Sequence, residues 1–344
     1  MTTFISGATG RVGGHLARKL IERGEQVVTL ALPGDPNIAA TEAMGVRCEI
    51  GNLTSAEDVR RAMAGARSVY HMAAVISFQP QARDLLWDVN VTGTRNVFEA
   101  AAALAADHPV RLVMASSDQV YPTRFARYRP TDENHPREPY SWYGLTKVIC
   151  EDMAAFFNRN VNGLDVSIAV FSHTEAPEEL IDPNGEYSSA AFYVNGRVKS
   201  LLASATHHAG ASSRAELQGV IDLLTPLMAD DEPLLLTYDQ HGQPHTQELI
   251  DVRDIVDGLL LIHDNPAAIG ETFNLAPAHP VSLAEFIPYL ARATGRRVVE
   301  AQIPVELGRT HGSNAKARAM LGFSPKYSLF DMVDEAVDKC AKTA

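Results

Sequence analysis

A glycine-rich turn near the N-terminus constrains the fold of this chain more than any other feature of its sequence. Gly7, Gly10 and Gly13 follow an apolar segment that ends at Ser6, and they precede a helical pattern of leucines that ends near Gly24. A strand, a tight turn and a helix N-terminus together present backbone N–H groups and the positive end of a helix dipole to an anion. Glycines let the ligand approach the backbone closely. The turn predicts a nucleotide-binding unit, with an ordinary strand-to-helix turn as the alternative.

The composition is that of a globular protein, with 46% hydrophobic and 21% charged residues among 344. A net charge of −12 argues against nucleic acid or an anionic membrane as the main partner. Cys48, Cys150 and Cys340 are too few and too scattered for a disulfide framework or a zinc site. The adjacent His207 and His208 point to different faces of a helix and do not suit one metal ion. We therefore expect no metal, no nucleic acid partner and no membrane partner.

The location of the protein is predicted from two further observations. The apolar segment at residues 4–6 turns at once into the glycine loop and leaves no room for a signal peptide. No apolar run approaches the roughly 20 residues of a membrane span. We expect a soluble, cytoplasmic protein.

Short apolar segments alternate with helical patterns through the first half of the chain. Strands are expected at residues 4–6, 26–32, 46–51, 68–72, 110–115 and 166–170, and a long helix from Arg83 to Ala106. This alternation predicts an α/β fold with a parallel, doubly wound sheet. Ligands of such sheets lie beyond the carboxyl ends of the strands, which places the Ser117 hydroxyl where it can bond a substrate oxygen. Ala73 and Ala74 follow another strand and allow close approach of a flat ligand, or equally close helix packing.

The end of the second strand bears on the choice of dinucleotide. An acidic residue there binds the 2′-hydroxyl of NAD, and an arginine accepts the 2′-phosphate of NADP. This chain has Leu32, Pro33 and Gly34, and Asp35 comes a few residues late. Because no Arg or Lys occurs between Gly24 and Arg47, NAD is favoured and NADP stays open.

Tyr143 and Lys147 are four residues apart in a segment with a helical pattern. This spacing puts both side chains on one helix face. A nearby cation stabilises phenolate and brings a group with an ordinary pKa of about 10 closer to neutrality. Tyr143 is therefore a candidate general acid/base, and a solvated surface pair is the alternative.

Several motifs occur together and in a fixed order. They are Gly7-x-x-Gly10-x-x-Gly13, His71-x-Ala73-Ala74, Asn90-x-x-Gly93-Thr94, Ser116-Ser117-x-x-Val120-Tyr121 and Tyr143-x-x-x-Lys147. In this the chain strongly resembles the extended short-chain dehydrogenases/reductases, the family of NAD-dependent sugar epimerases and dehydratases that includes UDP-glucose 4-epimerase. The resemblance covers nearly the whole chain and implies a Rossmann sheet with a smaller C-terminal substrate domain.

The resemblance also implies roles for individual residues. Tyr143 acts as the acid/base, Lys147 lowers its pKa and holds the nicotinamide ribose, and Ser117 bonds the same substrate oxygen. Asn52 stands where the family usually has an Asp that contacts the adenine amine. The remaining residues expected against the cofactor are Gly7, Gly10, Arg11, Val12, Gly13, Leu53, Ala73, Ala74, Asn90 and Ser116. Those expected against the substrate are Val75, Asp118, Gln119 and His173.

Three departures from the family pattern bear on the substrate. His173 takes the place of a substrate-binding Asn, and it either reads a substrate oxygen or only packs. Gln247 aligns with an Arg that grips a nucleotide diphosphate, and a neutral amide does not replace a bidentate charged contact. Arg197, Lys199 or Arg253 can supply that charge from elsewhere. Gln119 replaces the Glu of the sugar 4,6-dehydratases, and an amide cannot serve as their base.

These observations predict an NAD(P)-dependent oxidoreductase acting on a secondary hydroxyl of a sugar or sugar-derived substrate. One alternative is a dehydrogenase or reductase with exchangeable cofactor acting on a small polyol, sugar acid or ketone. Another is a non-catalytic, nucleotide-sensing regulator. The expected cofactor-binding domain comprises residues 1–173 and 248–276, and the substrate domain comprises 174–247 and 277–344. The resemblance implies a homodimer formed through helices near residues 83–106 and 140–158.

Overall fold

The structure of the protein is a computed structural model that describes residues 2–123, 126–185, 189–205, 211–305 and 310–343. The adjacent His207 and His208 lie outside these residues.

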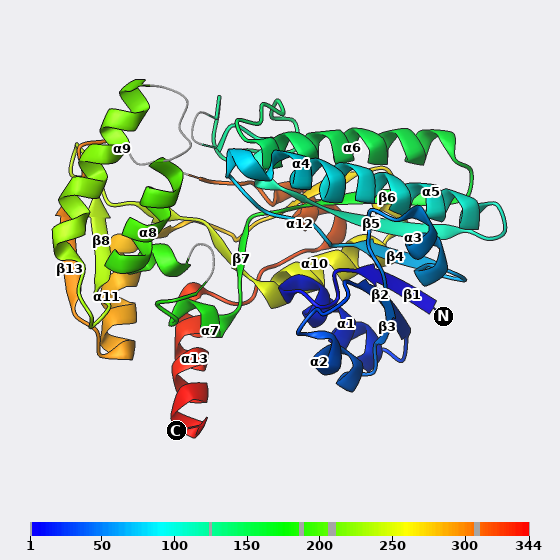
Figure 1. The fold of residues 1–344 in the computed structure, drawn as a ribbon, viewed down its shortest axis with the longest axis horizontal. Coiled ribbons are helices and arrows are strands. Elements are labelled where there is room, and N and C mark those ends of the chain that lie inside the picture. The colour runs from blue at the N-terminus through cyan, green and yellow to red at the C-terminus, as the bar shows by residue number, and fades with distance from the viewer. Residues whose placement is uncertain (1, 124–125, 186–188, 206–210, 306–309, 344) are drawn as a thin grey trace.

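A seven-stranded parallel sheet forms the larger part of the molecule (Figure 1). Its strands are β1 (Thr2–Ser6), β2 (Gln26–Ala31), β3 (Arg47–Ile50), β4 (Ser68–His71), β5 (Val110–Ser117), β6 (Leu164–Phe171) and β11 (Thr272–Leu275). They run in the order β11-β6-β5-β4-β1-β2-β3, and every adjacent pair is parallel. The reversal of strand order beside β1 confirms the predicted doubly wound α/β fold.

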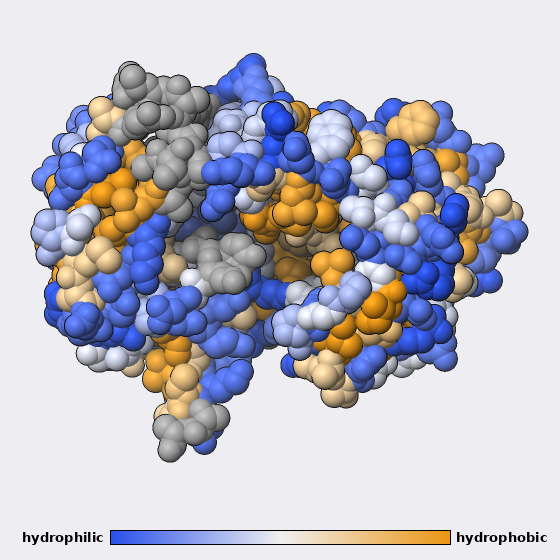
Figure 2. Space-filling view, in the orientation of Figure 1, coloured by the Kyte–Doolittle hydropathy of each residue, from blue (hydrophilic) through white to orange (hydrophobic). Residues whose placement is uncertain are grey.

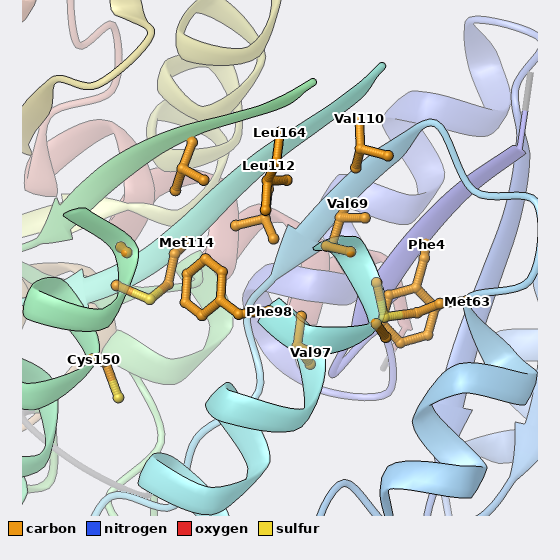
Figure 3. Close-up of a cluster of buried hydrophobic side chains, with 14 of the residues drawn as sticks. Phe4, Met63, Val69, Val97, Phe98, Val110, Leu112, Met114, Cys150 and Leu164 are labelled. Carbon is orange, nitrogen blue, oxygen red and sulfur yellow. The ribbon is translucent and has the colours of Figure 1, made fainter. Parts of the chain in front are cut away.

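Helices cover both faces of this sheet. One face carries α3 (Ala56–Ala62), α5 (Gly93–Ala105) and α6 (Trp142–Asn160), and the other carries α1 (Arg11–Glu22), α10 (Val252–Asp264) and α12 (Ala315–Leu321). Figure 3 shows part of the first core, where Phe98 of α5 lies beside Met114 of β5 and Phe4 lies beside Met63. Because both faces are covered, β2, β5 and β6 are rich in apolar residues, which made them recognisable in the sequence, whereas the edge strand β3 is partly exposed. The short helix α2 (Ile38–Ala43) connects β2 to β3.

The predicted helix from Arg83 to Ala106 is present but is not regular. It begins as α4 (Arg83–Leu86), passes through a π-helical turn, η2 (Trp87–Thr92), and continues as α5. Asn90 lies in the π turn and is buried. Such turns are rare and occur often near functional sites.

A second, smaller part of the molecule packs around a parallel pair of strands, β8 (Leu234–Tyr238) and β13 (Val298–Gln302). Around them lie α7 (Pro177–Leu180), α8 (Val194–Ala205), α9 (Ala211–Leu224), α11 (Leu283–Thr294) and α13 (Leu329–Thr343). Its cores include Phe192, Phe286 and Leu236. These clusters are separate from those of the large sheet, as expected for a smaller C-terminal unit.

Two short strand pairs complete the fold. The parallel strands β7 (His173–Glu175) and β10 (Leu249–Asp251) pair where the chain leaves and re-enters the larger part, and β9 (Thr246–Gln247) pairs antiparallel with β12 (Val281–Ser282). The β7–β10 pair lies at the predicted domain boundary, and the boundary itself stays a prediction.

Candidate active site

A cavity of about 1250 Å³ lies between the carboxyl edge of the large sheet and the smaller part of the molecule. The face shown in Figure 2 is hollowed between these two parts, with hydrophobic surface on the side of α4. Most of the predicted site residues line this one cavity: Gly7, Gly10, Arg11, Val12, Gly13, Ala73, Ala74, Ser116, Ser117, Asp118, Gln119, Tyr143 and His173. Segments more than 160 residues apart in sequence therefore meet where ligands of such sheets bind.

The glycine turn has the geometry that an anion site requires. Gly7 has φ +82°, and a Cβ there would lie 3.0 Å from the backbone of Ala73. A Cβ on Gly13 would lie only 2.1 Å from the carbonyl oxygen of Gly7. α1 begins at Arg11, directly after the turn, so its first N–H groups have no partner within the helix and lie at the cavity wall. Glycines that admit a ligand to the backbone and a helix N-terminus that favours negative charge fit a pyrophosphate.

A buried polar network fixes the turn from behind. The Ser6 hydroxyl oxygen accepts the N–H groups of Met72 (3.1 Å) and Ala73 (3.2 Å) and lies 2.7 Å from Nδ1 of His71. Because the Ser6 oxygen already accepts two N–H groups, its hydroxyl proton is donated to Nδ1 of His71. The proton of the neutral ring is then on Nε2, which lies 2.8 Å from the Thr94 hydroxyl oxygen. Burial, and then the Lys147 charge, lower the pKa of His71 to about 3. The imidazole is therefore neutral and serves as a fixed spacer between β1, β4 and α5.

Tyr143 and Lys147 lie at the start of α6, whose first turn is capped by the Ser141 hydroxyl accepting the Gly144 N–H at 3.0 Å. The ammonium nitrogen of Lys147 lies 5.9 Å from the centre of the Tyr143 ring and donates to the Ala115 carbonyl oxygen at 3.0 Å. Burial lowers the pKa of Lys147, against the opposing effect of Cys150 and Glu151. Tyr143 is 5% exposed and lines the cavity, so the pair is not a solvated surface pair.

Ser116 and Ser117 are the last two residues of β5, and they point to opposite sides of the sheet edge. The Ser117 hydroxyl accepts the Gln119 N–H at 3.3 Å and lies 3.3 Å from a carboxylate oxygen of Asp118. The Ser116 hydroxyl donates to Oε1 of Glu151 at 2.5 Å. Ser117 therefore lies with the cavity residues expected to meet a substrate, whereas Ser116 has a structural partner.

Glu151 was not predicted from the sequence. It is 5% exposed, lies 3.3 Å from Arg137, and burial raises the pKa of its carboxyl group. Glu151 lies four residues after Lys147, as Lys147 lies four residues after Tyr143. This repeated spacing on one helix face could have identified Glu151 from the sequence.

A close approach of backbones holds α6 against the end of β5. A Cβ on Gly144 would lie 2.2 Å from the carbonyl oxygen of Gln119, in the single turn η3 (Asp118–Val120). Only glycine permits this contact. The contact holds the first turn of α6, which carries Tyr143, directly against the turn that follows Ser117.

Several predicted site residues do not line the cavity. Asn90 is bound on both edges of its amide, accepting from the Val75 N–H at 2.8 Å and donating to the Val75 carbonyl at 2.9 Å and to Thr146 at 3.1 Å. It thereby ties the segment after β4 to α6. The Asn52 side-chain oxygen accepts the Thr54 N–H at 3.0 Å, and Leu53 is buried beneath α5. Lys147 is buried, with its ammonium nitrogen 5.9 Å from the centre of the Tyr143 ring, and neither it nor Val75 lines the cavity.

The smaller part supplies the opposite wall of the cavity. His173 lies 3.3 Å from the side-chain nitrogen of Gln247, and both line the cavity together with Arg197 and Lys199 of α8. Arg253 does not line it, because its guanidinium binds Asp251 at 2.6 Å and Glu335 at 2.7 Å and stacks 3.7 Å above the Tyr327 ring. Wall residues that no sequence motif indicated include Phe78, Thr237 and His245.

Metal ligands and membrane-spanning helices would each indicate a different kind of site. Within the part of the chain that the structure describes, no group of three or more His, Cys, Asp or Glu side chains is arranged to hold a metal ion. None of the helices in the described residues is both long and apolar enough to cross a membrane.

The sheet order, with the glycine turn, Ser117 and Tyr143 at one cavity and Lys147 buried beside Tyr143, defines a protein of the nucleotide-binding Rossmann class. Residues 3–276 match the model of the NAD-dependent epimerase/dehydratase family. The chain therefore belongs to this family, and the extended short-chain dehydrogenase/reductase resemblance is confirmed.

Relatives of known structure or description agree with this assignment. A short-chain dehydrogenase/reductase superfamily protein from Agrobacterium tumefaciens with bound NAD is 30% identical, with a TM-score of 0.86 and coverage of 100% of this chain and 98% of that one. A UDP-glucose 4-epimerase of Mycolicibacterium smegmatis is 26% identical over 98% of both chains. Sterol demethylase protein B of Methylococcus capsulatus is 32% identical over 49% of this chain. The matches to the first three curated relatives span 50 to 63% of those proteins' lengths.

Proposed function

We propose that this member of the NAD-dependent family is an oxidoreductase acting on a secondary hydroxyl of a sugar or sugar-derived substrate. The observation that carries the proposal is that Ser117 and Tyr143 line one cavity with the glycine turn, while the buried Lys147 lies next to the Tyr143 ring. A nicotinamide held there would supply the hydride acceptor and donor for the substrate carbon. A sensor needs the glycine turn but not an acid/base set, so the alternative of a non-catalytic regulator is disfavoured.

In this proposal the protein's own groups handle the proton and the orientation. Tyr143 takes the hydroxyl proton as hydride leaves the carbon and gives it back in the reverse direction. Lys147, held on the Ala115 carbonyl, stabilises the phenolate by its charge. Ser117 donates to the same substrate oxygen, where its hydroxyl gains most as the oxygen acquires charge. Gly144 allows the helix that carries Tyr143 to pack closely on the turn after Ser117.

The cofactor is proposed to be NAD, with NADP as the alternative. The N-terminus of α1 and the turn residues Gly7, Gly10 and Gly13 line the cavity and would hold the pyrophosphate. Asn37 lines the cavity beyond β2 and donates to the Thr9 carbonyl at 3.0 Å. No basic residue lies between Gly24 and Arg47 to receive a 2′-phosphate. The A. tumefaciens structure, in which NAD is bound, supports the same choice.

The substrate is proposed to be smaller than a nucleotide sugar. Gln247 lines the cavity where a charged diphosphate contact is expected, and Arg253 is bound elsewhere. Arg197 and Lys199 place positive charge on the same wall. The neutral Gln247 at the expected diphosphate contact brings a dehydrogenase with exchangeable cofactor to near parity, whereas the charges of Arg197 and Lys199 and the match to UDP-glucose 4-epimerase keep an epimerase open. A 4,6-dehydratase is disfavoured, because Gln119 lacks the carboxylate of the base.

We propose that the two parts of the molecule divide the binding of cofactor and substrate between them. Residues 1–173 and 248–276 would hold the cofactor, and residues 174–247 and 277–344 the substrate. A homodimer is proposed because large apolar side chains are exposed along α4, η2 and α6, namely Leu85, Trp87, Trp142, Leu145 and Phe156. An apolar surface of this kind typically marks an interface.

The proposed function is tested by identifying any nucleotide released from the purified, denatured protein and by assaying the protein against sugars, polyols, sugar acids and nucleotide sugars with added NAD. Reversible uptake of NAD and formation of NADH with a small substrate would support a dehydrogenase. Tightly bound NAD and interconversion of a UDP-sugar would support the epimerase alternative. Absence of turnover with every class would refute the proposed function.

A further inference from the structure

Arg11 belongs to the glycine turn, but its guanidinium is bound to the smaller part of the molecule. Its Nε lies 2.8 Å from Oε1 of Glu179, and one terminal nitrogen donates to the Thr174 carbonyl oxygen at 2.5 Å. The other terminal nitrogen lies 3.7 Å from Oε2 of Glu175. The guanidinium therefore links the start of α1 to β7 and α7.

Glu179 is held in position from its other side. Its Oε2 accepts the backbone N–H of Ala176, the residue before α7, at 2.7 Å. α7 in turn is anchored by Leu180, which is fully buried in the core that includes residues of α13. Figure 1 shows α7 beside the start of α13. The carboxylate is thus a fixed partner for Arg11 and not a solvated side chain that meets it by chance.

The charges at this contact are unequal. Arg11, Glu175 and Glu179 all line the cavity, and together they carry a formal charge of −1. The Glu175 side chain is 1% exposed, whereas Arg11 and Glu179 are 22% and 28% exposed and within reach of a ligand. A pyrophosphate at the N-terminus of α1 would bring two further negative charges to this wall. The pyrophosphate would meet the guanidinium of Arg11, which is already paired with Glu179 and Glu175.

We propose that Glu179 competes with the cofactor pyrophosphate for Arg11 and thereby keeps the cofactor exchangeable. The inference rests on the proposed binding of the cofactor at the glycine turn. When the pyrophosphate binds, Arg11 exchanges Glu179 for a phosphate oxygen, and the cost of breaking the first ion pair lowers the net affinity. When the cofactor leaves, Glu179 takes Arg11 back. Glu179 is thus a positioning residue that sets cofactor retention without touching the reacting atoms.

The test compares the variant Glu179→Gln with the wild-type protein and with the control variant Glu178→Gln. Glutamine keeps an oxygen that can accept the Ala176 N–H but removes the charge. Glu178 pairs with Lys339 at 3.7 Å and does not line the cavity. Binding of NAD, ADP and adenosine to each protein is measured by titration calorimetry, and NAD release by stopped flow.

We expect Glu179→Gln to lower the dissociation constant for NAD and ADP about two- to fivefold, as for a partly exposed ion pair, and to slow NAD release. Adenosine, which has no phosphate, should bind both proteins equally. Glu178→Gln should change none of these values. An unchanged or raised dissociation constant for NAD in Glu179→Gln would overturn the inference.

A second variant separates competition for Arg11 from direct repulsion of the phosphates. In an Arg11→Met background the effect of Glu179→Gln on NAD binding should disappear. If the effect persists at full size, Glu179 acts by repulsion alone and the exchange of partners is wrong. If neither the wild type nor any variant binds NAD, the proposed cofactor site itself fails. That outcome differs from the one that refutes only the role of Glu179, in which every protein binds NAD and Glu179→Gln does not change the dissociation constant.

Discussion

Replacement of Gly13 by Ala tests whether the glycine turn is built for close backbone contact. The new Cβ would lie 2.1 Å from the Gly7 carbonyl oxygen, 2.7 Å from the Gly7 carbonyl carbon and 2.9 Å from the Ala8 Cα. Real Cβ atoms do not come within 3.0 Å, so the carbonyl oxygen must move by 0.9 Å, from 2.1 to 3.0 Å. These neighbours are backbone atoms, and rotamer changes cannot relieve the overlap. Overpacking of this kind costs about 1–3 kcal/mol.

The neighbouring glycine provides a matched control. A Cβ on Gly14 would lie 3.3 Å from the Ala8 carbonyl oxygen, which needs only a small adjustment. Ala also favours the helix over Gly by about 1 kcal/mol, so Gly14→Ala should leave the free energy of unfolding near the wild-type value or raise it. Urea denaturation with and without NAD is the assay. We expect Gly13→Ala to lose about 1–3 kcal/mol and at least tenfold in NAD affinity. Equal stability and equal NAD binding in both variants would refute this account of the turn.

Three further predictions concern buried polar groups and the exposed helices. Ser116→Ala should lower the free energy of unfolding by about 1–3 kcal/mol in urea denaturation, because it leaves a buried oxygen of Glu151 without its donor, whereas Ser117→Ala should cost under about 1 kcal/mol. The pKa of His71 is about 3 in the folded protein and 6.5 for an ordinary histidine, so the unfolded chain binds more protons and stability falls as pH drops below about 6.5. His71→Asn should remove a slope of about 1.4 kcal/mol per pH unit between pH 6 and pH 4, and an unchanged slope would contradict the neutral-imidazole assignment. Trp142→Glu, at a side chain 43% exposed on α6, should shift sedimentation from dimer to monomer, and a monomeric wild type would refute the proposed interface.

Much of the fold was predictable because strands such as β2, β5 and β6 are rich in apolar residues and are covered by helices on both faces. Spacing alone made the glycine turn and the pair Tyr143 and Lys147 candidates, and the order of all the motifs along the chain was needed to decide between a site and the alternatives of an ordinary turn and a solvated pair. The π turn at Trp87–Thr92 was not, because it adds no residue type that a regular helix avoids.

The site was predictable only where neighbours in sequence are neighbours in space. Asn90 was identified from the sequence, but its contacts with Val75 and Thr146 depend on packing between separate elements. These contacts show that Asn90 holds the segment after β4 against α6. The bond of Arg11 to Glu179 joins residues 168 positions apart, and no local pattern predicts it. The wall formed by Thr237 and His245 comes from the smaller part of the molecule, where no motif is recognisable.

The most direct test of the central claim is turnover by Tyr143→Phe measured beside its NAD binding. With a substrate from the assay panel, NADH formation is followed in single-turnover experiments, and NAD binding is followed by calorimetry. The account predicts that the variant binds NAD as the wild type does, because the ring still packs at the cavity wall, while the rate of hydride transfer falls about 10²- to 10⁴-fold. Hydride transfer at the wild-type rate in Tyr143→Phe would remove Tyr143 from the chemistry and contradict the proposed mechanism.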